Sequence, residues 1–429
     1  MKKSLYIPIL AAVALLFSSC EQEYTQSTNW GDWEIFRGYM QFSTAVSTST
    51  RADKVLNMKG RDFGVIGYKY SGTTNWETAK AVTSPMTDFY NQQVFCDANG
   101  VCTYDVDITK NGNQLKQWED DSRYAFFAYH PFEFKDSGIT LSNSDVVGTP
   151  YLTYTYGWLE EANTGDPVIA YNDSRVFDLM TAEDINCDGS RNVALGFKHR
   201  LFAIEVLANN YNENEYEYEY EKDENGTILT DEHGNPIIKK DAEGNKVFAE
   251  DADGNKIILK DNSQSVSNLI LSIKGLNRTS MEIPLQDSEV ENNIKYTSGS
   301  VGDDNIVTFN ISGRKVDIPA FDVIKTEEDG SIRGGGYASS ISKLGSANGT
   351  GYVMLIPQYG ELEFALNWVW DKNDTEFNPE NVSNTLKSTM EFEAGKLYQI
   401  IINFVGSGVT IALIEAGSWD TLNVPYTFE

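Results

Sequence analysis

The sequence predicts an all-β protein with two tandem β-sandwich domains, the second carrying an acidic, hairpin-rich insertion. Aromatic residues make up 12% of the chain, with 23 Tyr and 21 Phe, and such residues favour strands. Short alternating segments recur between clusters of Gly, Asn, Asp and Ser, which is the pattern of sandwiches. No long segment shows the 3.6-residue period of an amphipathic helix.

The chain begins with the pattern of an export signal. Two lysines are followed by an apolar run over residues 6–17 and then by small residues directly before Cys20. The run is too short to span a bilayer, so residues 1–19 are expected to be a secretory signal peptide. A cysteine at the cleavage point resembles a bacterial lipobox, in which Cys20 is acylated and becomes the mature N-terminus. The alternative is an ordinary signal peptide with a chance cysteine.

Residues 20–34 are polar and are expected to form a lipidated tether. The acidic residues directly after Cys20 resemble the signal that sends lipoproteins to the outer face of the outer membrane. A net charge of −29 argues against nucleic acid as a partner, because the phosphates would be repelled. Acidity of this degree favours exposure outside the cell. The remaining length suffices for two domains, expected over 35–190 and 191–429.

The N-terminal domain is expected to start with a strand over residues 35–46, whose side chains alternate. A Ser/Thr-rich, flexible segment over 47–53 follows it and contains Arg51. An irregular stretch is expected from the last strand of this domain to about residue 190. The strands between these two segments are expected to start near residue 63 and to cover 92–107, 123–130 and 150–156.

Two cysteines flank a predicted hairpin turn. A three-residue loop, Ala98 to Gly100 with Gly100 at positive φ, would place Cys96 opposite Cys102. An oxidising compartment would allow a disulfide between them. Cys187 is left without a predicted partner.

The insertion covers residues 209–263 and holds 15 acidic residues and 6 lysines, a net charge of −9. The run YEYEYEYE has period two, which predicts an extended strand with the tyrosines on one face. Four D-x-x-G units then follow, each ending in apolar residues, and they predict a meander of short hairpins. A partly disordered acidic ribbon is the alternative. The flanking segments 193–208 (a long strand or a strand pair) and 266–273 are expected to be neighbouring strands.

The sequence contains no recognisable catalytic motif. The three histidines do not have metal-site spacing, and there is no GxSxG elbow. We therefore expect a protein that is not an enzyme and has no cofactor. One string, with Asp184, Asn186 and Asp188 before a glycine, has the start of a calcium loop. Its twelfth position is Leu195 instead of Glu, so a simple Asx-type turn is the alternative.

Several strings together resemble the fimbrillin-like family, the type V pilins and related lipoproteins of Bacteroidia. They are spread in order over most of the chain, and the insertion lies outside the pattern. The strings are Trp118 with YAFFAYHP (124–131), FDLMTA (177–182), VALGFKHRL (193–201), LIPQ (355–358), FEAGKLY (392–398), VTIAL (409–413) and Trp419.

This resemblance implies sandwiches of transthyretin-like type and a mechanism of assembly. The precursor is exported as a lipoprotein, and a trypsin-like protease cuts after a basic residue beyond the first strand. The lipid and that strand are removed, and the opened groove accepts a strand from another subunit. Arg51 is the expected cleavage point because it lies in a flexible segment, whereas Arg37 lies within the strand. Residues 409–414 alternate as a donor strand would, although a tip subunit need only accept one.

Two functions therefore compete. The first is a fimbrial subunit or tip adhesin, with other subunits and a surface ligand or glycan as partners, located at the outer membrane and in the fimbrium after processing. The alternative is a carbohydrate-binding surface lipoprotein that keeps its lipid anchor. Its exposed aromatic residues would stack on sugars.

Overall fold

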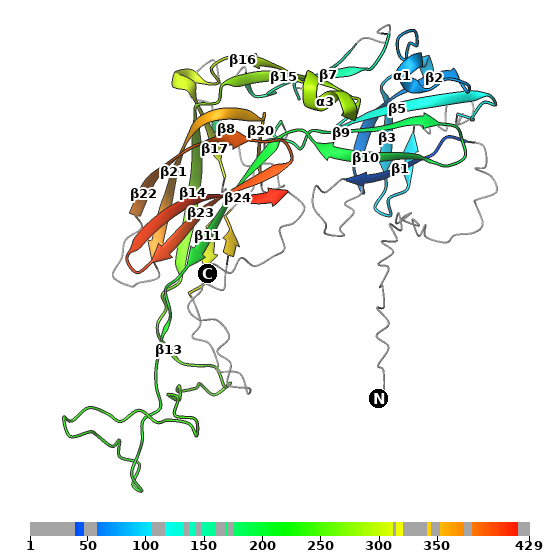
Figure 1. Cartoon of the computed structure of the whole chain (residues 1–429). Coiled ribbons are helices and arrows are strands. Elements are labelled where there is room, and N and C mark those ends of the chain that lie inside the picture. Colours follow the sequence, from blue (N-terminus) through cyan, green and yellow to red (C-terminus); the bar gives the residue numbers. More distant parts are fainter. Residues whose placement is uncertain are drawn as a thin grey trace, which may run out of the picture.

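The described part of the computed structural model is built mainly of strands, which confirms the predicted all-β class (Figure 1). The helical segments in the described part of the chain are short: α1 (Trp76–Ala79), α3 (Asp287–Asn293) and the 3-10 turns η1 (Thr87–Phe89) and η2 (Asp303–Asn305). None of these could cross a membrane. The structure describes residues 39–46, 58–104, 116–132, 137–142, 147–159, 168–169, 173, 175–311, 315–320, 341–344, 352–372 and 380–418.

Seven strands from the N-terminal half of the chain close into a barrel, in the order β1-β10-β9-β5-β2-β3-β4. Its interior is filled by apolar side chains, and the rings of Phe63, Phe126 and Phe197 are fully buried there. The strands are β1 (Phe42–Val46), β2 (Asp62–Ser71), β3 (Gln92–Cys96), β4 (Cys102–Tyr104), β5 (Ser122–His130), β9 (Met180–Cys187) and β10 (Val193–His199).

The second unit consists of two sheets that face each other across a large core. One sheet has the order β19-β11-β23-β24 with β20 also on β11, and the other has the order β22-β21-β14-β17-β8 with β18 also on β14. The first contains β11 (Phe202–Asn210), β19 (Ile341–Lys343), β20 (Val353–Leu355), β23 (Lys396–Val405) and β24 (Gly408–Ser418). The second contains β8 (Val168–Ile169), β14 (Gln264–Lys274), β17 (Ile306–Asn310), β18 (Val316–Ile318), β21 (Gln358–Lys372) and β22 (Glu380–Phe392).

A third small sheet joins the two units at the top of Figure 1. Its order is β16-β15-β7-β6, so strands from before and after the barrel's last strand pair with each other. The apolar core of the second unit continues through this region to the outer face of the barrel, where Tyr68 and Phe127 are fully buried. The strands are β6 (Ile139–Leu141), β7 (Tyr151–Thr155), β15 (Arg278–Pro284) and β16 (Lys295–Ser298).

The stretch before residue 190, expected to be irregular, contains the barrel strand β9. Its buried positions include Thr181 and Asp184, which hide the apolar alternation by which a strand is recognised. Arg200 donates to the Thr181 hydroxyl at 2.6 Å, and Arg191 pairs with the Asp184 carboxylate at 2.6 Å. These cations satisfy the buried oxygens and make polar residues acceptable at buried positions of the strand.

The segment 193–208 is a pair of strands divided between the two units. β10 completes the barrel, and β11 lies in the second unit after a break at Arg200 and Leu201. The earlier strand β8 already pairs with β17 in the second unit, so the chain passes between the units more than once, and the boundary of 190/191 stays a prediction. The expectation that 193–208 and 266–273 are neighbouring strands was wrong, because β11 and β14 lie in opposite sheets. Alternation shows which face of a strand is buried, but it does not reveal its partner.

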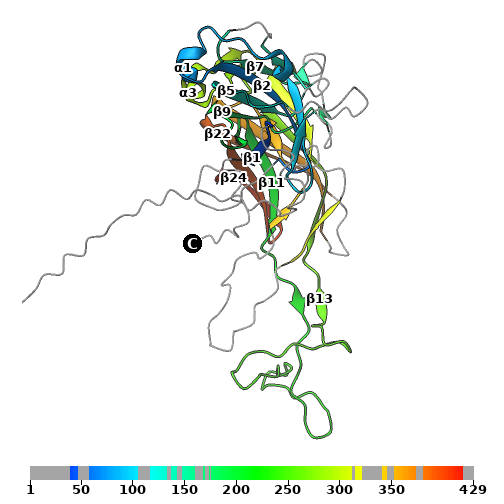
Figure 2. The same cartoon turned by 90° about the vertical axis from the view of Figure 1, so that its right-hand side faces the viewer.

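The insertion is a branched ribbon that extends away from the body of the protein (Figures 1 and 2). Its base is the short pair of β12 (Glu215–Tyr216) and β13 (Ile258–Lys260). Beyond this pair, Tyr218 bridges to Phe248 and Tyr220 to Ile238, so the tyrosine strand meets one returning hairpin after another. The extended tyrosine strand and the short hairpins match the sequence prediction.

Three cyclic sets of main-chain hydrogen bonds form the branch points of the ribbon. At the outermost one, Glu221 donates to Ile237, Ile237 to Leu229 and Leu229 back to Glu221, at 2.8 to 2.9 Å. Equivalent triangles start from Glu219 and Glu217. Each D-x-x-G turn is closed by an aspartate, such as Asp241, whose side chain accepts main-chain N–H groups. The ribbon is thus held by its main chain, with little apolar burial.

Candidate functional site: strand β1 and the groove it fills

Strand β1 is held in the barrel mainly from one side. It pairs in parallel with β10 over five residues, from Phe42 opposite Val193 to Val46 opposite Phe197. Its other neighbour is β4, which it meets at the single pair of Phe42 and Cys102. Among the described residues, β1 therefore has a full ladder on one edge and a single strand pair on the other, where Met40 also hydrogen-bonds to Lys116 and Tyr104.

The inward side chains of the β1 segment alternate, as the sequence predicted. Met40, Phe42 and Thr44 are 2%, 5% and 8% exposed, whereas Gln41 and Ser43 are only partly buried. The Phe42 ring meets four other rings edge-on, with centroid distances of 5.6 to 6.5 Å. Burying such a ring stabilises a fold by about 1.5–3 kcal/mol. The strand thus fills the barrel as well as closing its sheet.

The groove around β1 offers matched polar groups to the strand's main chain. The Tyr104 hydroxyl donates to the Met40 carbonyl at 3.1 Å, and the Met40 N–H donates to the Lys116 carbonyl at 2.7 Å. Val193 donates to the Gln41 carbonyl at 2.8 Å. Burial raises the pKa of Tyr104 to about 12, so its hydroxyl keeps its proton and its donor role at physiological pH.

Removing β1 would leave an open edge and an apolar trench. The β10 main-chain groups that now pair with β1 would lose their partners, and unpaired strand edges readily take another strand. The rings of Phe63, Phe89 and Phe126 would lose the side chain that covers them. A replacement strand needs apolar or small side chains at alternate positions to fill the same trench.

Both predicted processing residues, Cys20 and Arg51, lie outside the described residues. The described part of the chain stops at Val46, five residues before Arg51, and resumes at Met58. Met58 is fully buried, and its N–H donates to the Thr44 hydroxyl at 3.2 Å. A cut at Arg51 would therefore separate β1 from the barrel strand β2 without touching the described core.

Cys96 and Cys102 lie opposite each other at the end of the β3–β4 hairpin and are joined by a disulfide. The turn between them has Gly100 at φ 88°, and the Asp97 side chain accepts from Asn99 and Val101. This is the same turn as in the four units of the insertion. Cys187 is a buried free thiol, and burial raises its pKa.

The three residues of the calcium-like string lie close in sequence, but their side chains bind separate protein groups. Asp184 accepts from Arg191 and from the Ala194 N–H at 2.6 Å. Asn186 accepts from the Tyr70 hydroxyl at 3.0 Å, and Asp188 from the Ser190 N–H at 3.0 Å. Within the described residues, no group of three or more His, Cys, Asp or Glu could hold a metal ion. Calcium binding here remains a prediction, and the guanidinium on Asp184 does not favour it.

Strand β24 contains the segment expected to serve as a donor strand. It pairs with β23 at the edge of its sheet, and its residues Val409, Ile411 and Leu413 pack against the core of its own unit. Its alternating pattern fits a donor, yet in this structure the strand is part of its own sheet. The pairing of β1 with β10 was not predicted, because 150 residues separate the two strands.

Among the known proteins compared with this chain, only solved structures are similar to it. No family model and no curated protein matches the chain. The structure is similar to a fimbrial protein from Bacteroides vulgatus, at 14% identity and a TM-score of 0.46, over 89% of this chain and 99% of that one. It is also similar to a candidate cell adhesion protein from Bacteroides ovatus, at 11% identity and a TM-score of 0.44, over 89% of this chain and 97% of that one. A candidate cell adhesion protein from Bacteroides uniformis matches at 13% identity and a TM-score of 0.38, over 91% of this chain and 99% of that one.

Proposed function

We propose that this protein is a fimbrial subunit or tip adhesin, exported as a lipoprotein and assembled by proteolysis-triggered strand exchange. Acylation of Cys20, for example by palmitate, holds the precursor at the outer surface of the outer membrane. Cleavage after Arg51 removes the lipid together with β1. The vacated groove then accepts a strand from another subunit, and the protein acts in adhesion without catalysing a reaction.

The observation that carries this proposal is the way β1 is held. A strand whose inward side chains fill a barrel core, yet which among the described residues has a full ladder on one edge and only one strand pair on the other, can be replaced by another strand of the same pattern. The sequence provides a basic residue just beyond it. The resemblance to the fimbrillin-like strings independently implies the same first strand and the same type of cleavage.

The test is limited trypsin digestion of the purified precursor, with wild type compared to Arg51→Ala/Lys54→Ala, because trypsin also cuts after lysine and Lys54 follows closely. We expect wild type to lose residues 1–51 and to form higher oligomers on size-exclusion chromatography, and the double variant to stay monomeric. Arg61→Ala is the matched control, because Arg61 is an exposed arginine on the other side of the same segment. This control should be cut and should assemble like wild type.

Two results would count against the proposal. One is a precursor that trypsin leaves intact or cuts within the barrel. The other is a product cleaved after Arg51 that stays monomeric when mixed with a peptide of residues 408–418. An intact, lipid-bearing monomer would support the permanently anchored surface lipoprotein instead. Labelling of cells with a palmitate analogue, with Cys20→Ala as the control, tests the anchor itself.

A further inference from the structure

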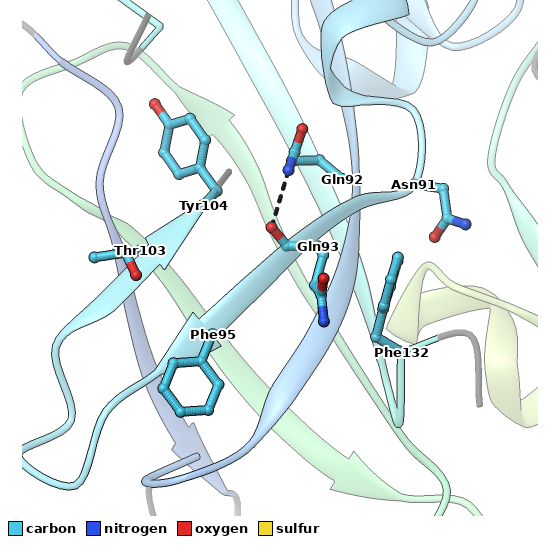
Figure 3. Close-up of a pocket in the computed structure, with 7 residues that line it drawn as sticks. All are labelled: Asn91, Gln92, Gln93, Phe95, Thr103, Tyr104 and Phe132. Carbon is cyan, nitrogen blue, oxygen red and sulfur yellow. Dashed lines mark hydrogen bonds between the residues drawn. The ribbon is translucent and has the colours of Figure 1, made fainter. Parts of the chain in front are cut away.

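A surface pocket lies on the barrel beside the β3–β4 hairpin (Figure 3). Its volume is about 640 Å³, which is within the ~300–1,000 Å³ range of small-molecule sites. Seven side chains line it, and none of these described residues carries a charge: Asn91, Gln92, Gln93, Phe95, Thr103, Tyr104 and Phe132. None of the functions assigned above uses this pocket.

Aromatic rings border the pocket. Phe95 is 48% exposed although strands pair with it on both sides, and Phe132 is partly buried at the opposite side in Figure 3. Phe95 and Tyr359 are the exposed aromatic side chains among the described residues. An exposed ring costs solubility and gains no core burial, so its place at the rim of a pocket suggests a ligand with an apolar face.

Amide groups supply the polar part of the lining. The Gln93 Nε2 group donates to Asp62 at 2.9 Å, which fixes the amide and leaves its oxygen as an acceptor. The Gln92 Nε2 group donates to the Gln93 carbonyl at 3.0 Å, shown as the dashed line in Figure 3. Asn91 accepts from the Tyr129 hydroxyl at 2.7 Å through Oδ1. Side-chain amides both donate and accept, which suits hydroxyl groups.

The floor of the pocket is rigid. Phe95 pairs with Thr103 across the hairpin, and the disulfide Cys96–Cys102 closes the ladder one residue further on. Val94 and Phe95 are paired on both sides, by β2 and by β4. A fixed ring loses little entropy when a ligand stacks on it, which favours affinity.

We propose that this pocket binds a neutral saccharide. A pyranose presents an apolar C–H face, which suits the Phe95 ring, and a rim of hydroxyls, which suits the amides and Thr103. On a chain of net charge −29, the uncharged side chains that line the pocket among the described residues disfavour anionic sugars and offer no ion pair to a charged ligand. An extended peptide cannot add as a strand at Phe95, because both edges of β3 are already occupied there.

The proposal specifies the surface ligand of the adhesive role proposed above. It is tested separately from assembly, on uncleaved precursor. Binding of neutral oligosaccharides (glucans, mannans, galactans, xylans and N-acetylated hexoses) is measured by calorimetry and compared with sialylated and sulfated sugars. We expect binding of at least one neutral sugar and none of the anionic ones. Phe95→Ala should lower the affinity roughly tenfold or more, because about 1.4 kcal/mol of stacking corresponds to tenfold.

Matched variants distinguish a site from general surface effects. Tyr359→Ala removes an exposed ring on β21, 67% exposed, and should leave binding unchanged. Phe95→Trp keeps a ring in place and should retain binding, while Gln93→Ala should weaken it about threefold or more. The proposal is overturned if no neutral sugar binds, if anionic sugars bind equally well, or if Phe95→Ala and Tyr359→Ala behave alike. Loss of sugar binding with intact trypsin-triggered assembly would leave the fimbrial function standing.

Discussion

Replacing Phe42 by Ala tests whether β1 is an exchangeable strand. Phe42 is 5% exposed and meets four rings, so its truncation should leave a cavity in the barrel. Phe→Ala changes in cores cost about 3–5 kcal/mol. We expect about 3 kcal/mol, at the low end, because β1 is a short strand with one weak edge and can shift to fill part of the cavity.

Hydrogen exchange shows where in the barrel the Phe42→Ala substitution lowers stability. The Val193 N–H, which is bonded to the Gln41 carbonyl, should exchange faster in Phe42→Ala by roughly 100-fold, the factor that about 3 kcal/mol corresponds to when β1 opens locally. Phe126→Ala is the matched control, since Phe126 is fully buried in the same core but stays after cleavage at Arg51.

The two variants should diverge after trypsin treatment. Phe42 leaves with the cleaved segment, so the processed product is identical to wild type and should assemble normally. Phe126→Ala keeps its defect in the trench and should assemble less. Unchanged exchange at Val193 in Phe42→Ala, or an assembly defect in that variant, would refute the reasoning.

Three further predictions follow from other parts of the molecule. Burial and the nearby Asp287 raise the pKa of Glu183 to about 7, so this group stabilises the fold most below its unfolded pKa of about 4.5 and loses that contribution as pH rises through 7. Glu183→Gln should therefore raise stability at pH 8 by about 1 kcal/mol, after discounting for partial exposure, and flatten thermal melting between pH 4.5 and 7. Cys102→Ser should lower the free energy of unfolding by about 2 kcal/mol in denaturant titrations, as expected for a short closed loop; no change would mean that the cysteines are reduced in solution. Deleting residues 215–260 should leave the melting temperature of the rest of the protein within a few degrees of wild type. The Asn262 N–H donates to the Asn214 side chain at 2.9 Å, so the two new chain ends already lie close together. Global unfolding of this variant would show that the ribbon supports the core.

Local patterns predicted the local structure well. The alternation in residues 35–46 identified strand β1, and the segment DANG predicted the turn between β3 and β4 with Gly100 at positive φ. The repeated D-x-x-G units also predicted the hairpins of the insertion. In each case the signal and the contacts that it describes lie within a few residues of each other, so sequence period and turn chemistry are sufficient.

Long-range pairing was not predictable in the same way. β9 was missed because its buried positions include Thr181 and Asp184, which are acceptable only through Arg200 and Arg191 from outside the strand. β22 was missed because its outward face is polar over most of its length. The pocket at Phe95 was also missed, since a phenylalanine in an alternating strand gives no sign of whether its ring faces the core or the solvent.

The core that continues from the second unit to the outer face of the barrel has a mechanical consequence. The Trp76 Nε1 group donates to Gln286 at 3.1 Å and Lys80 pairs with Glu289 at 2.7 Å, so polar links between the units reinforce the shared apolar packing. If the protein is pulled as part of a filament, the two units should therefore respond as one rigid body and should not separate at a flexible linker. If the protein assembles by strand exchange as proposed, stretching should be taken up at the joints between subunits, and each subunit should stay folded until the exchanged strand slides out.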